Sequence, residues 1–131
     1  DLYAGKVQAA LDFLDQGGDY VFLHVEAPDE CGHAGNVADK VESIARFDAR
    51  VVAPIRRALA GQSAALVVAC DHLTPLAIRT HSPDPVPFLF WRADDATSGP
   101  AAFSESTAAA SGLALETGHG LLAWTLEQAR R

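Results

Sequence analysis

Residues 64–72 read Ala-Ala-Leu-Val-Val-Ala-Cys-Asp-His, so seven apolar or small residues lead directly into two polar side chains. A short apolar run of this kind predicts a buried strand. Residues 20–25, Tyr-Val-Phe-Leu-His-Val, have the same character and predict an earlier strand. Between the two, apolar residues recur at helical spacing from Val37 to Leu59. Strand, helix and strand in this order predict an α/β fold with parallel pairing and a right-handed crossover.

Further helices and a third strand are expected on either side of this unit. The expected elements are helices over 2–16, 105–111 and about 118–130, a third strand over 86–91, and loops over 26–35 and 71–85. Asn36 is expected to cap the long central helix, because its side-chain oxygen can accept from the first turn. Pro54 should kink or break that helix, since it lacks a backbone N–H.

The composition limits the class of protein. With 131 residues, of which 49% are hydrophobic, the chain has the size of one domain with a core. A net charge of −7 without a basic cluster argues against nucleic acid and anionic membranes as partners. No run reaches the roughly 18 apolar residues of a membrane span. Two cysteines do not make a disulfide framework, so we expect a cytoplasmic protein. Because the chain begins with Asp1 in place of Met, we expect a fragment, a processed form or a trimmed version of a longer protein.

Polar side chains gather in the two loops that follow the first two expected strands. In parallel sheets, functional groups collect beyond the carboxyl ends of the strands. The residues concerned are Asp29, His33, Asp71, His72 and His81. Each alone has a simpler explanation as a turn former, a cap or a hydrogen-bonded loop histidine. Together, carboxylates and imidazoles at one sheet edge predict a site for a divalent metal such as Zn²⁺ or Mn²⁺.

The roles predicted for the histidines depend on the local structure around each one. Asp29 and His33 are four residues apart, so they can face one point only if their segment forms a helical turn. His24 lies within an expected strand and is assigned to the core or to a position beside a metal ligand. His119, near the start of the last helix, is assigned to capping or packing.

Three motifs carry a resemblance to a known family. They are His-Val-Glu-Ala-Pro-Asp-Glu-Cys-Gly-His at 24–33, Cys-Asp-His-Leu-Thr-Pro at 70–75, and Arg-Thr-His-Ser-Pro-Asp-Pro-Val-Pro-Phe at 79–88. In order and spacing they resemble the cofactor-independent (2,3-bisphosphoglycerate-independent) phosphoglycerate mutases of the archaeal type, members of the alkaline phosphatase superfamily. The first motif alone also fits nucleotide pyrophosphatases and related phosphodiesterases. The residues after His81 favour the mutase.

The resemblance implies a fold and a set of metal ligands. The implied fold is an alkaline-phosphatase-like three-layer α/β sandwich, with a mainly parallel sheet and helices on both faces, of which residues 1–131 form the C-terminal part. Two divalent ions, Mn²⁺, Zn²⁺ or Mg²⁺, are implied as cofactors. Asp29, His33 and His81 match the ligands of one ion, and Asp71 and His72 match part of the shell of the other. The family completes that second shell with an Asp near its N-terminus and a nucleophilic Ser, and this chain has neither motif.

The implied activity is that of a glycolytic isomerase. It interconverts 3- and 2-phosphoglycerate through a phosphoserine intermediate. Without the nucleophile, this chain alone is expected to be inactive and to bind one metal ion or none. Apolar edges left by an incomplete sheet make a homo-oligomer one expectation. The alternatives are part of a phosphodiesterase or phosphonate hydrolase of the same superfamily, or a non-catalytic assembly module.

Overall fold

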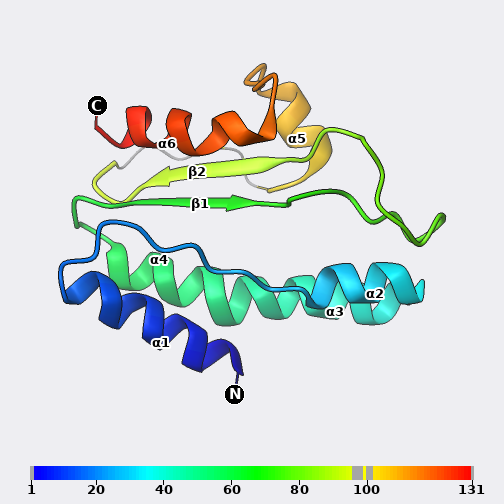
Figure 1. The fold of residues 1–131 in the computed structure, drawn as a ribbon, viewed down its shortest axis with the longest axis horizontal. Helices are drawn as coiled ribbons and strands as arrows, with labels where there is room; N and C mark the ends of the chain where they lie inside the picture. Colours follow the sequence, from blue (N-terminus) through cyan, green and yellow to red (C-terminus); the bar gives the residue numbers. More distant parts are fainter. Residues whose placement is uncertain (1, 96–98, 100–101, 131) are drawn as a thin grey trace. The chain divides into compact units, whose positions relative to one another are not determined.

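The computed structural model describes residues 2–95, 99 and 102–130. They divide into two compact units. Figure 1 shows the helices and strands, coloured along the sequence. The first unit comprises the described residues of 1–58 and 74–82, and the second comprises those of 59–73 and 83–131. In this described part of the chain, no helix is both long and apolar enough to cross a membrane.

The first unit is helical. Its elements are α1 (Leu2–Asp15), α2 (Ala27–Ala34), α3 (Val37–Phe47), the π-helical turn η1 (Asp48–Val52) and α4 (Ala53–Leu59), whose last residue belongs to the second unit. The Asn36 side chain accepts a hydrogen bond from the Asp39 N–H at 3.1 Å, which confirms the predicted cap of α3. Gly17 follows α1 with a φ of 92°, a left-handed conformation that glycine adopts without strain.

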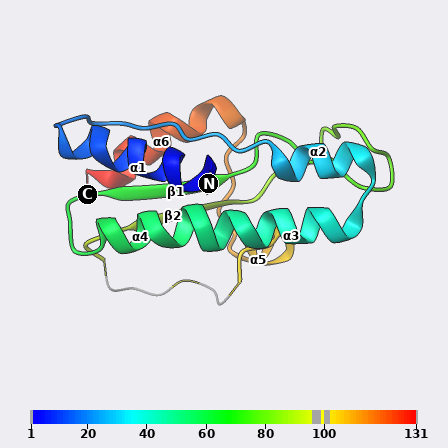
Figure 2. The ribbon, with the colours of Figure 1, turned by 90° about the horizontal axis from the view of Figure 1, so that it is seen from below.

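Pro54 does not break the central helix. Figure 2 shows α3, η1 and α4 as one continuous rod. Proline cannot donate to the preceding turn, and its ring crowds that turn. The five residues just before α4 widen into a π-helical turn, in which the Ala53 N–H donates to the Asp48 carbonyl. A wider turn of this kind accommodates the proline, so the predicted kink or break is replaced by a local π-bulge.

The predicted apolar face of this rod is buried at only two positions, both in its second half. Val51 is 3% exposed and Leu59 is 7% exposed, whereas Val37, Val41 and Ile44 of α3 are all more than half exposed. Helix α1 packs against η1, and Val7 and Ala10 of α1 are buried. The core of the first unit therefore lies at the contact between α1 and η1.

The second unit is a strand pair with helices. Its elements are β1 (Ala65–Ala69), β2 (Phe88–Arg92), α5 (Glu105–Ala110), the 3₁₀ turn η2 (Gly118–Gly120) and α6 (Leu121–Ala129). The strands pair with Val67 opposite Phe90. Helix α6 contacts β2 through Trp124, whose ring lies 5.4 Å from the rings of Phe88 and Phe90 in an edge-on arrangement. These ring contacts attach α6 to the strand pair.

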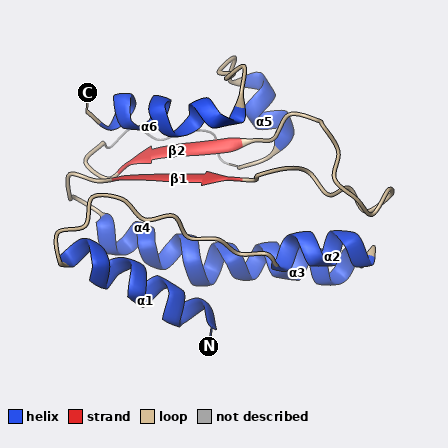
Figure 3. Cartoon of the chain, viewed as in Figure 1, coloured by secondary structure: helices blue, strands red, loops and turns tan. Residues whose placement is uncertain are grey.

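Three expectations about the sheet and its loops are wrong. The sequence predicts a mainly parallel sheet in which 20–25 pairs with 64–70, but the pair observed in the described residues is β1 with β2, the third predicted strand, and it is antiparallel. Residues 20–25 are extended but belong to no strand (Figure 3), with Phe22 76% exposed. The segment 26–35, expected as a loop, contains α2. A β-prone run becomes a strand only when another backbone segment pairs with it, and sequence pattern does not supply that partner. The mixed α/β class is confirmed.

We predict that two valines of the same helical rod differ sharply in their effect on stability. Val51→Ala removes buried methyl groups beside α1 and should lower the free energy of unfolding by about 2 kcal/mol. Val37→Ala, the matched control at 60% exposure, should change it by less than about 0.5 kcal/mol. Urea unfolding followed by circular dichroism measures both. Equal losses would contradict the observed burial.

Candidate metal centre

Helix α2 places Asp29 and His33 on one face. Pro28 stands in the first turn, where its missing N–H costs nothing, and Asp29 and Glu30 follow at the positive end of the helix dipole. Gly35 ends the helix with a φ of 69°, and its N–H bonds back to the carbonyls of the last turn. The four-residue spacing therefore becomes one helical turn, and His33 Nε2 lies 3.3 Å from Asp29 Oδ2.

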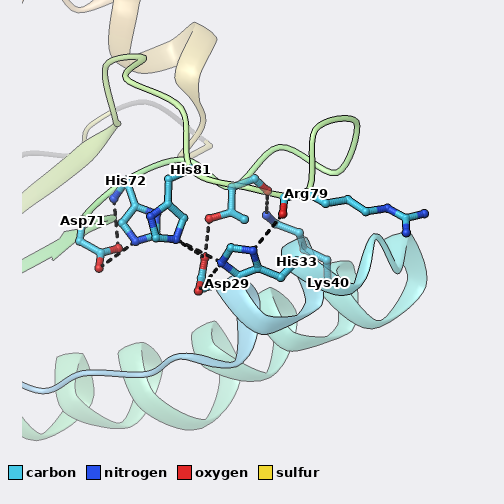
Figure 4. A network of polar contacts seen from close by, with 8 residues as sticks. Asp29, His33, Lys40, Asp71, His72, Arg79 and His81 are labelled. Carbon is cyan, nitrogen blue, oxygen red and sulfur yellow. Dashed lines mark hydrogen bonds and ion pairs between the residues drawn. The ribbon is translucent and has the colours of Figure 1, made fainter.

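The segment 74–82 brings His81 to the same point. His81 Nε2 lies 3.1 Å from His33 Nε2 and 3.6 Å from Asp29 Oδ1. Figure 4 shows the two imidazoles and the carboxylate turned toward one another. One ligand atom from each of the three residues lies within 4.8 Å of the other two. The structure thus unites Asp29, His33 and His81, as the sequence predicts.

A backbone contact sets the tautomer of His33. Its Nδ1 lies 3.0 Å from the Arg79 carbonyl oxygen, which can only accept, so Nδ1 carries the proton and donates it. The lone pair of His33 is therefore on Nε2, which faces Asp29 and His81. Such a carbonyl partner behind a histidine is typical of metal-binding imidazoles, because it fixes both tautomer and ring orientation. Arg79 adopts a φ of 54°, an uncommon left-handed conformation for a non-glycine residue.

The nitrogen and oxygen atoms of this cluster lie at separations close to those found around a divalent ion. Tetrahedral bonds of 2.0–2.2 Å place neighbouring ligand atoms about 3.3–3.6 Å apart. His33 Nε2 lies 3.1 Å from His81 Nε2 and 3.3 Å from Asp29 Oδ2, and His81 Nε2 lies 3.6 Å from the other carboxylate oxygen, Asp29 Oδ1. The three side chains are between 32% and 51% exposed, so solvent and small ligands reach them. Two nitrogens and one carboxylate oxygen are donors that Zn²⁺ and Mn²⁺ accept.

Two residues that the sequence analysis did not identify support this centre. The Thr74 hydroxyl donates to Asp29 Oδ1, and Thr74 is only 5% exposed. The Lys40 ammonium donates to the Thr74 carbonyl at 2.6 Å. Gly32 allows this approach, since a Cβ there would lie 2.8 Å from the Thr74 carbonyl oxygen and 2.9 Å from Lys40 Nζ. The sequence pattern does not predict a role for Lys40. Thr74 could be suspected only because it follows Asp71-His72 closely in the sequence.

The remaining predicted ligands lie in the second unit. Asp71 and His72 follow β1 and form a pair of their own, with His72 Nε2 3.4 Å from Asp71 Oδ2 and the His72 N–H bonded to Asp71 Oδ1. Among the described residues, no larger group of ligand-type side chains includes this pair. Their role in binding a second ion stays a prediction.

The two other histidines lie outside the cluster. His24, predicted for the core, has a half-exposed side chain, with its Nδ1 3.8 Å from Glu26 Oε1. The core assignment is therefore wrong, and the alternative position beside a metal ligand stays a prediction. His119 lies 3.4 Å from the Thr117 hydroxyl at the start of η2. Its position there agrees with the predicted place near a helix start.

Comparisons with known proteins agree with these features. The model of the metalloenzyme superfamily matches residues 2–121. A protein of Geobacter sulfurreducens named "probable 2,3-bisphosphoglycerate-independent phosphoglycerate mutase" is 44% identical over 131 residues, covering 96% of this chain and 32% of that protein. A 2,3-bisphosphoglycerate-independent phosphoglycerate mutase of Methanothrix thermoacetophila is 43% identical, covering 92% of this chain and 31% of that protein. These matches confirm the resemblance inferred from the motifs.

A solved structure shares the fold. The PH0037 protein from Pyrococcus horikoshii matches with a TM-score of 0.87 and 28% sequence identity, over 98% of this chain and 38% of that one. The chain therefore spans about a third of the length of the curated relatives it matches and a similar share of this structural neighbour.

We predict opposite effects for two glycines inside helices. Gly32→Ala in α2 drives a Cβ against the Thr74 backbone and should destabilise the protein, because backbone cannot move aside as a side-chain end can. Gly5→Ala in α1, the matched control with nothing within 4 Å, should stabilise it by about 0.5–1 kcal/mol through helix propensity. Thermal unfolding of both variants is the measurement. Stabilisation by Gly32→Ala would contradict the close contact.

Proposed function

The chain belongs to the metalloenzyme superfamily, and on this premise we propose that it is the metal-binding portion of a 2,3-bisphosphoglycerate-independent phosphoglycerate mutase. The observation that carries the proposal is the convergence of Asp29, His33 and His81, with the lone pair of His33 directed into the cluster. The names of the relatives support the choice of reaction.

Asp29, His33 and His81 would hold one divalent ion. One carboxylate and two neutral imidazoles leave such an ion with one net positive charge. A bound divalent ion supplies positive charge that stabilises a phosphoryl group during transfer. This donor set therefore suits an anionic phosphate ester such as phosphoglycerate, and the partial exposure of the three side chains leaves room for it.

Asp71 and His72 would contribute to a second ion. We assign its remaining ligands, and the serine that accepts the phosphoryl group, to sequence outside this chain. The relatives support this division, since they are about three times as long as the region that matches. Residues 1–131 would then be the C-terminal part of a three-layer α/β domain in a glycolytic, cytoplasmic enzyme.

We predict that the purified chain binds about one Mn²⁺ or Zn²⁺ ion. Loss of a group that only hydrogen-bonds to a metal ligand typically weakens metal binding about tenfold or more. His33→Ala and His81→Ala each remove a ligand itself, so each should weaken binding at least about tenfold. His119→Ala, which removes a histidine outside the cluster, is the matched control and should bind like the unmodified chain. Isothermal calorimetry gives affinity and stoichiometry. Identical isotherms for all four proteins would contradict the site.

A second prediction concerns the reaction. The chain alone should not interconvert 3- and 2-phosphoglycerate, whereas a longer protein that contains it should. An enzyme-coupled assay detects the interconversion, and an aryl phosphodiester serves as the control substrate. Hydrolysis of the diester without interconversion would assign the longer protein to the phosphodiesterases of the superfamily. Inactivity of the longer protein toward both would favour an assembly module.

A further inference from the structure

We infer that Thr74 is a positioning residue, which orients the Asp29 carboxylate for metal binding and is itself held by Lys40. The inference rests on the proposed metal site. It starts from two hydrogen bonds that join three segments of the first unit, namely α2, α3 and residues 74–82.

The two oxygens of Asp29 have different surroundings. Oδ2 faces His33 Nε2 at 3.3 Å. Oδ1 accepts from the Thr74 hydroxyl and lies 3.6 Å from His81 Nε2. A hydroxyl that donates to one oxygen fixes the rotation of the whole carboxylate, because both oxygens lie in one plane. The bond to Thr74 therefore decides where the lone pairs of Oδ2 point.

The Thr74 hydroxyl is well suited to this task. Thr74 is 5% exposed, so few water molecules compete for its proton. A hydrogen bond to an ionised carboxylate is shorter and stronger than one between neutral groups. β-Branching at Thr74 restricts its χ1 angle, which limits the directions in which the hydroxyl can point.

Lys40 holds Thr74 from the other side. Its ammonium, on α3, donates to the Thr74 carbonyl at 2.6 Å. Gly32 on α2 lets both groups come close, since a Cβ there would lie within 3 Å of each. The backbone of residue 74 is thus tied to α3 while its side chain reaches Asp29 on α2. The ligand is oriented before the ion arrives, which reduces the cost of ordering it on binding.

Thr74→Val and Thr74→Ser form the decisive pair, with Mn²⁺ alone as the probe. Valine keeps the shape and removes the hydroxyl, so the Mn²⁺ dissociation constant should rise about 10–100-fold. Serine keeps the hydroxyl and should stay within about threefold of the unmodified protein, a rescue that a purely steric role would not produce. Calorimetry gives the affinities. The visible absorption of bound Co²⁺ should change in the valine variant and remain unchanged in the serine variant.

Lys40→Met and Lys40→Gln provide a second test that leaves Thr74 in place. Methionine has a similar length without a donor, whereas glutamine retains one. The methionine variant should weaken Mn²⁺ binding by a smaller factor than Thr74→Val does, and the glutamine variant should recover part of it. Circular dichroism of each variant establishes that it is folded before its affinity is compared.

The outcomes separate this inference from the proposed site. If the unmodified protein binds Mn²⁺ and His33→Ala does not, the site stands. Equal affinity of Thr74→Val and the unmodified protein would then overturn the inference alone, and so would a serine variant as weak as the valine variant. If the unmodified protein binds no Mn²⁺ or Zn²⁺, the proposed site fails and the inference fails with it.

Discussion

The close approach of residue 74 to Gly32 is the contact on which the candidate centre depends. It lets the Lys40 ammonium reach the Thr74 carbonyl and the Thr74 hydroxyl reach Asp29. The chain then continues to His81, seven residues later, so the same contact helps to place the third ligand beside α2. Any side chain at position 32 would push these groups apart. The support of the candidate centre therefore requires a residue without a Cβ at position 32.

The sequence predicts the three side chains that converge at this candidate centre better than it predicts the residues that support them. Asp29 and His33 are recognisable because a four-residue spacing becomes one face of a helix, and α2 provides that helix. His81 is recognisable because it belongs to a third motif of polar residues. Thr74 and Lys40 act through contacts 45 and 34 residues apart in sequence. No local pattern encodes such a pairing, so these two residues emerge only from the folded structure.

The fold shows the same division between local and distant information. The cap at Asn36 and the positions of β1 and β2 depend on near neighbours, and the sequence predicts them. Strand pairing depends on contacts between distant parts of the chain, and the predicted parallel pairing of 20–25 with 64–70 does not occur among the described residues. Residues 20–25 have strand character without a strand partner among the described residues, which leaves Phe22 exposed. Propensity marks a candidate strand, but only pairing makes one.

Charge links this architecture to its proposed chemistry. The chain carries a net charge of −7, yet its three-ligand cluster contains only one carboxylate. A cluster of three carboxylates would more than cancel the charge of a divalent ion, and the net negative charge would repel a phosphate ester. Two imidazoles supply ligand atoms without negative charge, and the Arg79 carbonyl keeps one of them in the tautomer that can bind. The neutrality of the histidines is therefore what would leave positive charge for an anionic substrate in an otherwise acidic protein.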